Sequence, residues 1–292
     1  MQTISLDGLE HPAERRWEHR GHPYPAEAEV LRRHGNIVAA APVTNGPRGV
    51  GVWDLDSGKL RFWDAWGDTV RFLESGMLVA VDGSISLLSW PDLATLESVD
   101  APEMAETFVV SPSEKVLVVH QNDGQGLNGY EVFSLGPLVK RSDHIGLRED
   151  PMYSMPVFSP SERYVACSPG GDYFWVPDDE ADWPEDWDKD EAEIPTAGGQ
   201  IRFGDLLVHD LATDTVARSE LRFDLEPGWV PEDCWDSRWH YGAIDLEFVA
   251  DEHIKLRLPD GTWVDLALPL PDTVVLPTPN RELPGQPSVD RS

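Results

Sequence analysis

Short apolar runs, separated by turns rich in Gly, Pro, Asp and Ser, dominate the chain from about residue 30 to residue 270. Runs of this length with turn residues at both ends are typical of β-strands. Met77-Leu-Val-Ala-Val81, for example, lies between Gly76 and Asp82-Gly83. No long stretch has the 3.6-residue periodicity of an amphipathic helix. The pattern therefore predicts an all-β protein.

One of these strand signals occurs twice, 48 residues apart. Val110-Ser-Pro-Ser-Glu-Lys-Val-Leu-Val-Val119 and Phe158-Ser-Pro-Ser-Glu-Arg-Tyr-Val-Ala-Cys167 each join an apolar residue, a Ser-Pro-Ser turn and a β-rich run. Segments that begin at Leu31, Phe72 and Phe248 share the order of apolar residue, polar turn and strand. The first three steps between these anchors are about 40–50 residues, the length of a four-stranded propeller blade. We expect equivalent core positions, in successive blades, for Phe72, Val110, Phe158 and Phe248.

A second marker, a strand that ends in Asp-Leu, supports the same repeat. Gly51-Val-Trp-Asp-Leu55 follows the first anchor, and Leu207-Val-His-Asp-Leu211 follows the fourth after a longer interval. The excess in the fourth unit coincides with an acidic insertion at residues 177–200. We therefore predict a β-propeller of five blades with an insertion in the fourth. Six blades are the alternative, because the step from 158 to 248 is about two blades long.

The markers also resemble a known family. Trp53-Asp54 followed by Ser57-Gly58-Lys59, together with the two Ser-Pro-Ser turns, resembles the repeats of WD40-like β-propellers, including bacterial proteins of that kind. The resemblance covers roughly residues 30–270 and concerns architecture. It implies a rigid platform for protein partners.

The repeat divides the chain into three regions. Residues 1–29 form a polar N-terminal segment, in which Thr3-Ile-Ser-Leu6 is expected to add a strand to the last blade and so close the ring. Residues 30–270 form the propeller. Residues 271–292 contain five Pro and few large apolar residues. We expect this tail to be largely disordered after a last strand at Thr273-Val-Val-Leu276.

Charge and composition narrow the classes of partner and compartment. The formal net charge is −30, from 53 Asp and Glu against 23 Lys and Arg. This excess argues against nucleic acid or an anionic membrane as a partner and favours a basic protein, although it also fits solubility or a salty cytoplasm. There is no apolar run of membrane-spanning length, no visible secretory leader, and there are only two Cys. We expect a cytoplasmic protein.

Two segments combine the chemistry of a protein-binding surface. The acidic insertion carries two Trp among its carboxylates, and a second loop, residues 226–241, carries three more Trp. Large aromatic residues are enriched in buried interfaces, whereas a solvated linker seldom contains them. The alternative is that both segments fold back and pack their Trp on the propeller. The predicted partner-binding residues are Trp183, Asp186, Trp187, Asp188, Asp190, Glu191, Trp229, Trp235 and Trp239.

The sequence has no recognisable catalytic motif. It lacks a nucleophile elbow, a phosphate-binding glycine loop and a His-Glu-x-x-His helix, and the acidic insertion departs from the calcium-loop pattern. We expect no catalytic residue, metal or cofactor, and a non-enzymatic interaction module or scaffold for a basic protein. The alternative function is a carbohydrate-active or small-ligand-binding five-bladed propeller, which would use a pair of carboxylates and the Trp-rich loop.

Overall fold

All the regular elements described by the computed structural model are β-strands, which confirms the prediction of an all-β protein. Among the residues that the structure describes, no helix is long and apolar enough to cross a membrane. The chain divides into two compact units, Met1–Asn122 with Gly129–Ile145, and Asp123–Asn128 with Gly146–Ser292. The residues described are 2–11, 26–42, 49–64, 69–81, 83–101, 105–122, 127–146, 154–169, 199–225, 234–235, 238–239, 244–258 and 261–277.

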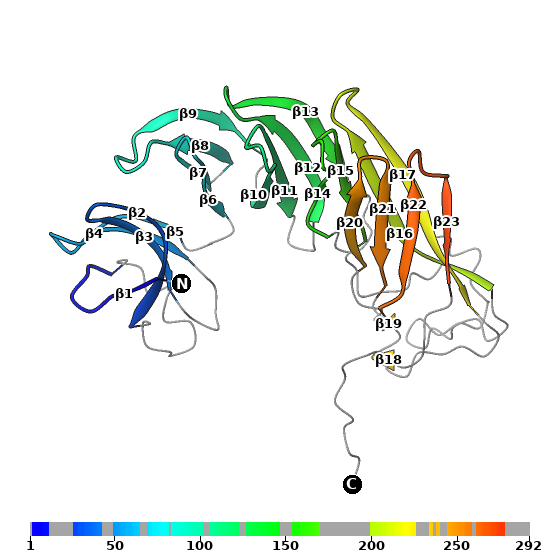
Figure 1. The fold of residues 1–292 in the computed structure, drawn as a ribbon, viewed down its shortest axis with the longest axis horizontal. Helices are drawn as coiled ribbons and strands as arrows, with labels where there is room; N and C mark the ends of the chain where they lie inside the picture. Colours follow the sequence, from blue (N-terminus) through cyan, green and yellow to red (C-terminus); the bar gives the residue numbers. More distant parts are fainter. Residues whose placement is uncertain are drawn as a thin grey trace, which may run out of the picture. The chain divides into compact units, whose positions relative to one another are not determined.

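The first unit contains three sheets with the simple order of successive hairpins (Figure 1). The first sheet has the order β1-β2-β3-β4-β5, formed by Thr3–Ser5, Glu27–His34, Ile37–Pro42, Val50–Asp54 and Lys59–Asp64. The second has the order β6-β7-β8-β9, formed by Val70–Phe72, Met77–Val81, Ser84–Leu88 and Thr95–Asp100. The third has the order β10-β11-β12-β13, formed by Ala105–Val110, Val116–Asn122, Leu127–Ser134 and Val139–Gly146.

The second unit contains two larger sheets and a short hairpin. The fourth sheet has the order β14-β15-β16-β17-β23, formed by Val157–Phe158, Tyr164–Cys167, Gly199–Asp210, Thr215–Leu225 and Thr273–Leu276. The fifth has the order β20-β21-β22, formed by Asp245–Ala250, His253–Arg257 and Trp263–Ala267. The hairpin pairs β18, Cys234–Trp235, with β19, Arg238–Trp239.

Within each unit, neighbouring sheets pack face to face through apolar clusters. Ala39 and Val52 of the first sheet meet Met77 and Val79 of the second, and all four side chains are buried. A separate cluster joins the second and third sheets, and another joins the fourth and fifth. Stacked antiparallel sheets of three to five strands are propeller-like, as the sequence repeat predicts.

The predicted repeat positions are equivalent in successive hairpins, but the prediction that they lie in the core is wrong. The buried residues lie opposite them on the next strand. The four anchors predicted to lie in the core, Phe72, Val110, Phe158 and Phe248, each end, or nearly end, the first strand of a hairpin, and each is only half-buried. The core positions belong to their register partners, because the partners are on the central strands, between two neighbours. The pairs of anchor and buried partner are Phe72 with Met77, Val110 with Leu117, Phe158 with Val165, and Phe248 with Ile254.

The place four residues after the anchors Leu31, Val110 and Phe158 has a left-handed backbone conformation. Gly35, Glu114 and Glu162 occupy this place, with φ of 57°, 55° and 61°. This left-handed conformation is free for Gly but strained for a residue with a Cβ. The turn at Gly35 and the two Ser-Pro-Ser-Glu turns therefore share one backbone conformation at this place.

Opposite stability changes are expected from exchanging residue types at this place. Glu162→Gly is expected to stabilise the protein by about 0.5–1 kcal/mol by relieving the strain at φ 61°. Gly35→Ala is expected to cost about 1 kcal/mol, although no atom lies within 4 Å of the added Cβ. Urea titration of both variants checks this, and a shift of both in the same direction would contradict it.

The first strand pairs differently from the prediction, and the last strand, for which no partner was predicted, joins the fourth sheet. β1 was expected to complete the last blade, but it pairs antiparallel with β2 of the first sheet, with Ile4 opposite Ala28. β23 is a strand as predicted, and it pairs in parallel with β17 of the fourth sheet. The fifth sheet therefore has three strands in the described part of the chain.

Candidate functional site

The two segments predicted to bind a partner attach to the same hairpin. The acidic insertion precedes β16, and the Trp-rich loop follows β17. β16 begins at Gly199, so the last two residues of the predicted insertion, 199 and 200, are strand residues. The Trp-rich loop, predicted as irregular, contains the hairpin β18–β19, and the backbones of Trp235 and Trp239 belong to it. The remaining predicted residues lie outside the described residues: Trp183, Asp186, Trp187, Asp188, Asp190, Glu191 and Trp229.

The register of β16 with β17 places the attachment points side by side. Gly199 and Leu225 are direct partners at the end of this antiparallel pair, and the Cα atoms of such partners lie about 4.5–5.5 Å apart. β23 runs parallel to β17, with Leu276 opposite Phe223, so the chain leaves β23 towards the same end. The acidic insertion, the Trp-rich loop and residues 278–292 thus all attach at one end of the fourth sheet, which we call the loop end.

The loop end is built on a hairpin that is longer than the other strands of its sheet. β16 has 12 residues and β17 has 11, but β15 pairs only with Leu207–Asp210. Beyond β15, the hairpin is anchored because Leu221 and Phe223 of β17 are fully buried against Val274 and Leu276 of β23. β23 therefore stabilises the part of the β16–β17 hairpin that carries both predicted binding segments.

The β16–β17 hairpin has a β-bulge in the part that extends beyond β15. The register of β16 with β17 shifts between Arg202 and Gly204, and Gly204 has a φ of 154°. A Cβ at Gly204 would lie 2.9 Å from the ring of Pro169, the last described residue before the insertion. The glycine thus permits a close approach of the two chain segments at the place where the hairpin extends beyond β15.

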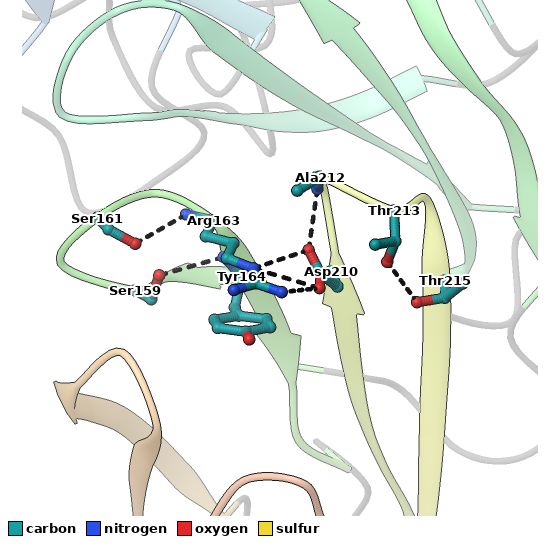
Figure 2. Close-up of polar contacts among 8 residues, drawn as sticks. All are labelled: Ser159, Ser161, Arg163, Tyr164, Asp210, Ala212, Thr213 and Thr215. Carbon is teal, nitrogen blue, oxygen red and sulfur yellow. Dashed lines mark hydrogen bonds and ion pairs between the residues drawn. The ribbon is translucent and has the colours of Figure 1, made fainter.

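The opposite end of the fourth sheet, the turn end, is closed by a polar network (Figure 2). The Arg163 guanidinium donates to the Asp210 carboxylate from Nε, at 3.2 Å, and from Nη2, at 2.6 Å. Asp210 Oδ1 also accepts a hydrogen bond from the backbone N–H of Ala212 at 2.9 Å. Arg163 holds the pKa of Asp210 at about 2, below its ordinary value. The ion pair ties the β14–β15 turn to the end of β16.

The network extends to the fifth sheet. Asp251 Oδ1, in the turn between β20 and β21, accepts a hydrogen bond from the backbone N–H of Ser161 at 2.8 Å. This backbone donor lowers the pKa of Asp251. Ser159 Oγ accepts from the backbone N–H of Tyr164, and the Arg163 guanidinium lies 4.8 Å from the Tyr164 ring centroid. These groups satisfy one another within the protein, which is the behaviour of a structural network.

Asp210→Asn is expected to destabilise the protein by about 1–2 kcal/mol at neutral pH, because it weakens a two-pronged charge-assisted hydrogen bond. The estimate is modest because the Arg163 side chain is half exposed and screened by solvent. The folded pKa is the lower one, so the stabilisation is complete above about pH 4 and disappears as the pH falls towards 2. Denaturant titrations of both forms across this range check the prediction. Asp92→Asn, an exposed carboxylate, is the control with little expected effect.

The carbohydrate-active or small-ligand-binding alternative stays a prediction. A glycoside hydrolase needs a general acid with a raised pKa, whereas the carboxyl groups with a shifted pKa, Asp54, Asp210 and Asp251, are all lowered. Burial raises the pKa of the Cys167 thiol to about 12, and a thiol of this kind is inert at neutral pH. Within the described ranges, no group of three or more His, Cys, Asp or Glu is arranged to hold a metal ion.

Comparison with known proteins gives only distant structural similarity. No protein-family model and no curated protein matches the sequence. The chain is similar to hydrazine synthase of Kuenenia stuttgartiensis, with 14% identity, a TM-score of 0.46, and coverage of 80% of this chain and 62% of that one. For Hsv2 of Kluyveromyces lactis the values are 13%, 0.41, 84% and 62%. For a chain of the mitotic checkpoint complex they are 18%, 0.32, 46% and 43%. The chain therefore spans less than two thirds of these chains, and no functional conclusion rests on them.

Arg163 and Asp210 both belong to sequence markers of the repeat, but the sequence analysis did not predict that they form an ion pair. Arg163 follows the second Ser-Pro-Ser turn, and Asp210 belongs to the Asp-Leu marker. The same two turns also meet in the first and third sheets, where Leu55 N–H donates to Asn36 O and Leu135 N–H donates to Lys115 O. In the first sheet the Asn36 side chain adds a neutral hydrogen bond to the Asp56 carboxylate at 2.6 Å. Opposite charges at these two marker positions were the available signal for the ion pair.

Proposed function

We propose that this chain is a cytoplasmic, WD40-like β-propeller of five blades that acts as a non-enzymatic interaction module for a basic protein partner. The binding surface is formed at the loop end of the fourth sheet by the acidic insertion and the Trp-rich loop. The observation that carries the proposal is the direct pairing of Gly199 with Leu225. This pairing places side by side the attachment points of two segments that composition alone marks as separate candidates.

The two segments have complementary tasks in this proposal. The carboxylates of the insertion attract a basic surface and accelerate its encounter, because long-range charge acts mainly on the association rate. The Trp side chains supply the buried anchors that hold a complex once it has formed. The turn end does not have this character, since its main charges are neutralised within the protein by Arg163, Asp210 and their neighbours.

The test begins with capture of the partner from the native host and identification by mass spectrometry, followed by measurement of its binding kinetics. Joint neutralisation of Asp186, Asp188, Asp190 and Glu191 to the corresponding amides is expected to slow association about tenfold or more at low salt. Replacement of Trp183 and Trp187 by Ala is expected to accelerate dissociation instead. The association rate of the unmodified chain should fall steeply with salt.

A matched control separates the insertion from overall charge. It neutralises four exposed carboxylates elsewhere, Glu27, Asp92, Asp100 and Glu247, so it changes the net charge equally. This control should alter association much less than the insertion variant. Equal slowing in both variants, or unaltered affinity after deletion of residues 178–193, would overturn the proposal.

A further inference from the structure

Residues 2–11, which we call the strap, cover one face of the first sheet. The other face packs on the second sheet. On the covered face, Val38, Ala40 and Trp53 are fully buried, and Leu6 of the strap completes their cluster with an exposed fraction of 1%. Ile4 and Leu9 pack against the same cluster. The strap therefore covers part of the apolar face of the first sheet.

The strap binds first as an additional strand. Thr3, Ile4 and Ser5 pair antiparallel with β2. Val30 N–H donates to Gln2 O at 2.8 Å, and Leu6 N–H donates to Ala26 O at 2.9 Å. Backbone pairing of this kind, with pockets for alternate side chains, is the general mode by which sheet edges bind extended peptides.

A tight turn then directs the strap across the sheet. Leu9 N–H donates to Leu6 O at 3.2 Å, and Gly8 has a φ of 81° within this turn. The turn passes close to Gly58, where an added Cβ would lie 3.2 Å from Gly8 O. A residue with a side chain is disfavoured at Gly8, because it seldom adopts this φ.

The far end of the strap is held by three hydrogen bonds to one residue. Glu10 N–H donates to Gly58 O at 2.6 Å. The Trp53 indole N–H donates to Glu10 O at 2.9 Å. Leu60 N–H donates to the Glu10 carboxylate at 3.0 Å. The first sheet thus presents two donors and one acceptor that together recognise a glutamate and its backbone.

We propose that this face of the first sheet is a binding groove for an extended peptide of the pattern Ile-x-Leu-x-Gly-Leu-Glu, and that residues 2–11 are its intramolecular occupant. The contacts are those of a peptide-recognition site: an added strand, a closed pocket for Leu6, a turn that needs Gly8 and a polar clamp for Glu10. The proposed partner is a protein that carries this pattern and takes the place of the strap, whose covalent link to β2 is formed by residues 12–25.

The test uses the full chain with a protease site placed within residues 12–25, cleaved after folding. A fluorescent peptide of residues 2–11 is expected to exchange into the cleaved protein and to co-elute with it. The Leu6→Ala peptide should bind at least about tenfold more weakly, because it loses a buried leucine side chain. A Thr3→Ala peptide, altered at an exposed position, should bind within about twofold of the original. The intact chain should bind the peptide at least about 100-fold more weakly than the cleaved chain, because its own strap competes at a millimolar effective concentration.

A second variant keeps the test valid if cleavage unfolds the protein. The intact Leu6→Ala chain has a weakened strap and should bind the unaltered peptide more tightly than the intact original chain does. The proposal is overturned if the peptide binds neither the cleaved chain nor this variant, or if the Leu6→Ala peptide binds equally well. Dimers of intact chains that exchange residues 2–11 would also overturn it, since they would assign the groove to a second copy.

Discussion

Gly51→Ala is expected to destabilise the protein by about 2–3 kcal/mol, a large effect for the addition of one methyl group. A Cβ at Gly51 would lie 2.1 Å from Cη2 of Trp53. The indole has no room to move, because Trp53 is fully buried and its N–H donates to Glu10 O. The glycine of the Gly51-Val-Trp53 marker is therefore required by the tryptophan two residues later.

A double-mutant cycle distinguishes this clash from a general loss of strand stability. Trp53→Leu alone is expected to cost about 3 kcal/mol through lost burial and a cavity. In the Trp53→Leu background, Gly51→Ala should cost less than about 1 kcal/mol, because the colliding ring atoms are gone. Urea titration of the four proteins measures the cycle, and equal costs of Gly51→Ala in both backgrounds would contradict the predicted contact.

Acidification from pH 7 to pH 4 is expected to remove about 3 kcal/mol of stability through His120 alone. His120 is fully buried, and within the described part of the chain neither ring nitrogen has a hydrogen-bond partner. Burial lowers the pKa of His120 to about 4. The unfolded chain binds a proton at this side chain below about pH 6.5, whereas the folded chain does so only near pH 4. The contribution of neutral His120 to the free energy of unfolding is therefore complete above about pH 6.5 and is lost as the pH falls to 4.

Replacement of the imidazole isolates this contribution. His120→Leu should abolish about 2 kcal/mol of the stability loss between pH 7 and pH 5, because a leucine does not titrate. Val118→Ala is the matched control, since Val118 is a fully buried neighbour on the same strand and its truncation should lower stability equally at both pH values. A wild-type pH dependence in His120→Leu would show that the imidazole does not lose its proton on folding.

The hairpin turns and the ends of several strands could be predicted from the sequence, because each depends on residues that are close together in the chain. The Ser-Pro-Ser turns predicted the β10–β11 and β14–β15 hairpins, and the Asp-Leu marker predicted the ends of β4 and β16. The choice of core residues failed at Phe158 and its equivalents because burial depends on sheet position. An apolar residue at the end of the first strand has only one side covered, whereas its partner on the next strand lies between two strands.

The pairings of the two terminal strands could not be obtained from the repeat. β1 and β23 stand outside the periodic part of the sequence, and their partners, β2 and β17, are chosen by tertiary contacts. The strap was classed as part of a polar segment because only Ile4, Leu6 and Leu9 in it are apolar. For the candidate site, composition identified the acidic and Trp-rich segments. Their common attachment depends on the register of Gly199 with Leu225, which no local pattern specifies.

The most direct test of the proposed interaction module is site-specific photo-crosslinking to the captured partner from the two ends of the fourth sheet. A photoreactive amino acid is introduced either at Asp224, exposed at the loop end, or at Thr213, exposed at the turn end. Both positions belong to the same hairpin, so the two proteins differ only in which end carries the probe. The account predicts crosslinks to the partner from position 224 and not from position 213. Crosslinks from position 213 alone would contradict it.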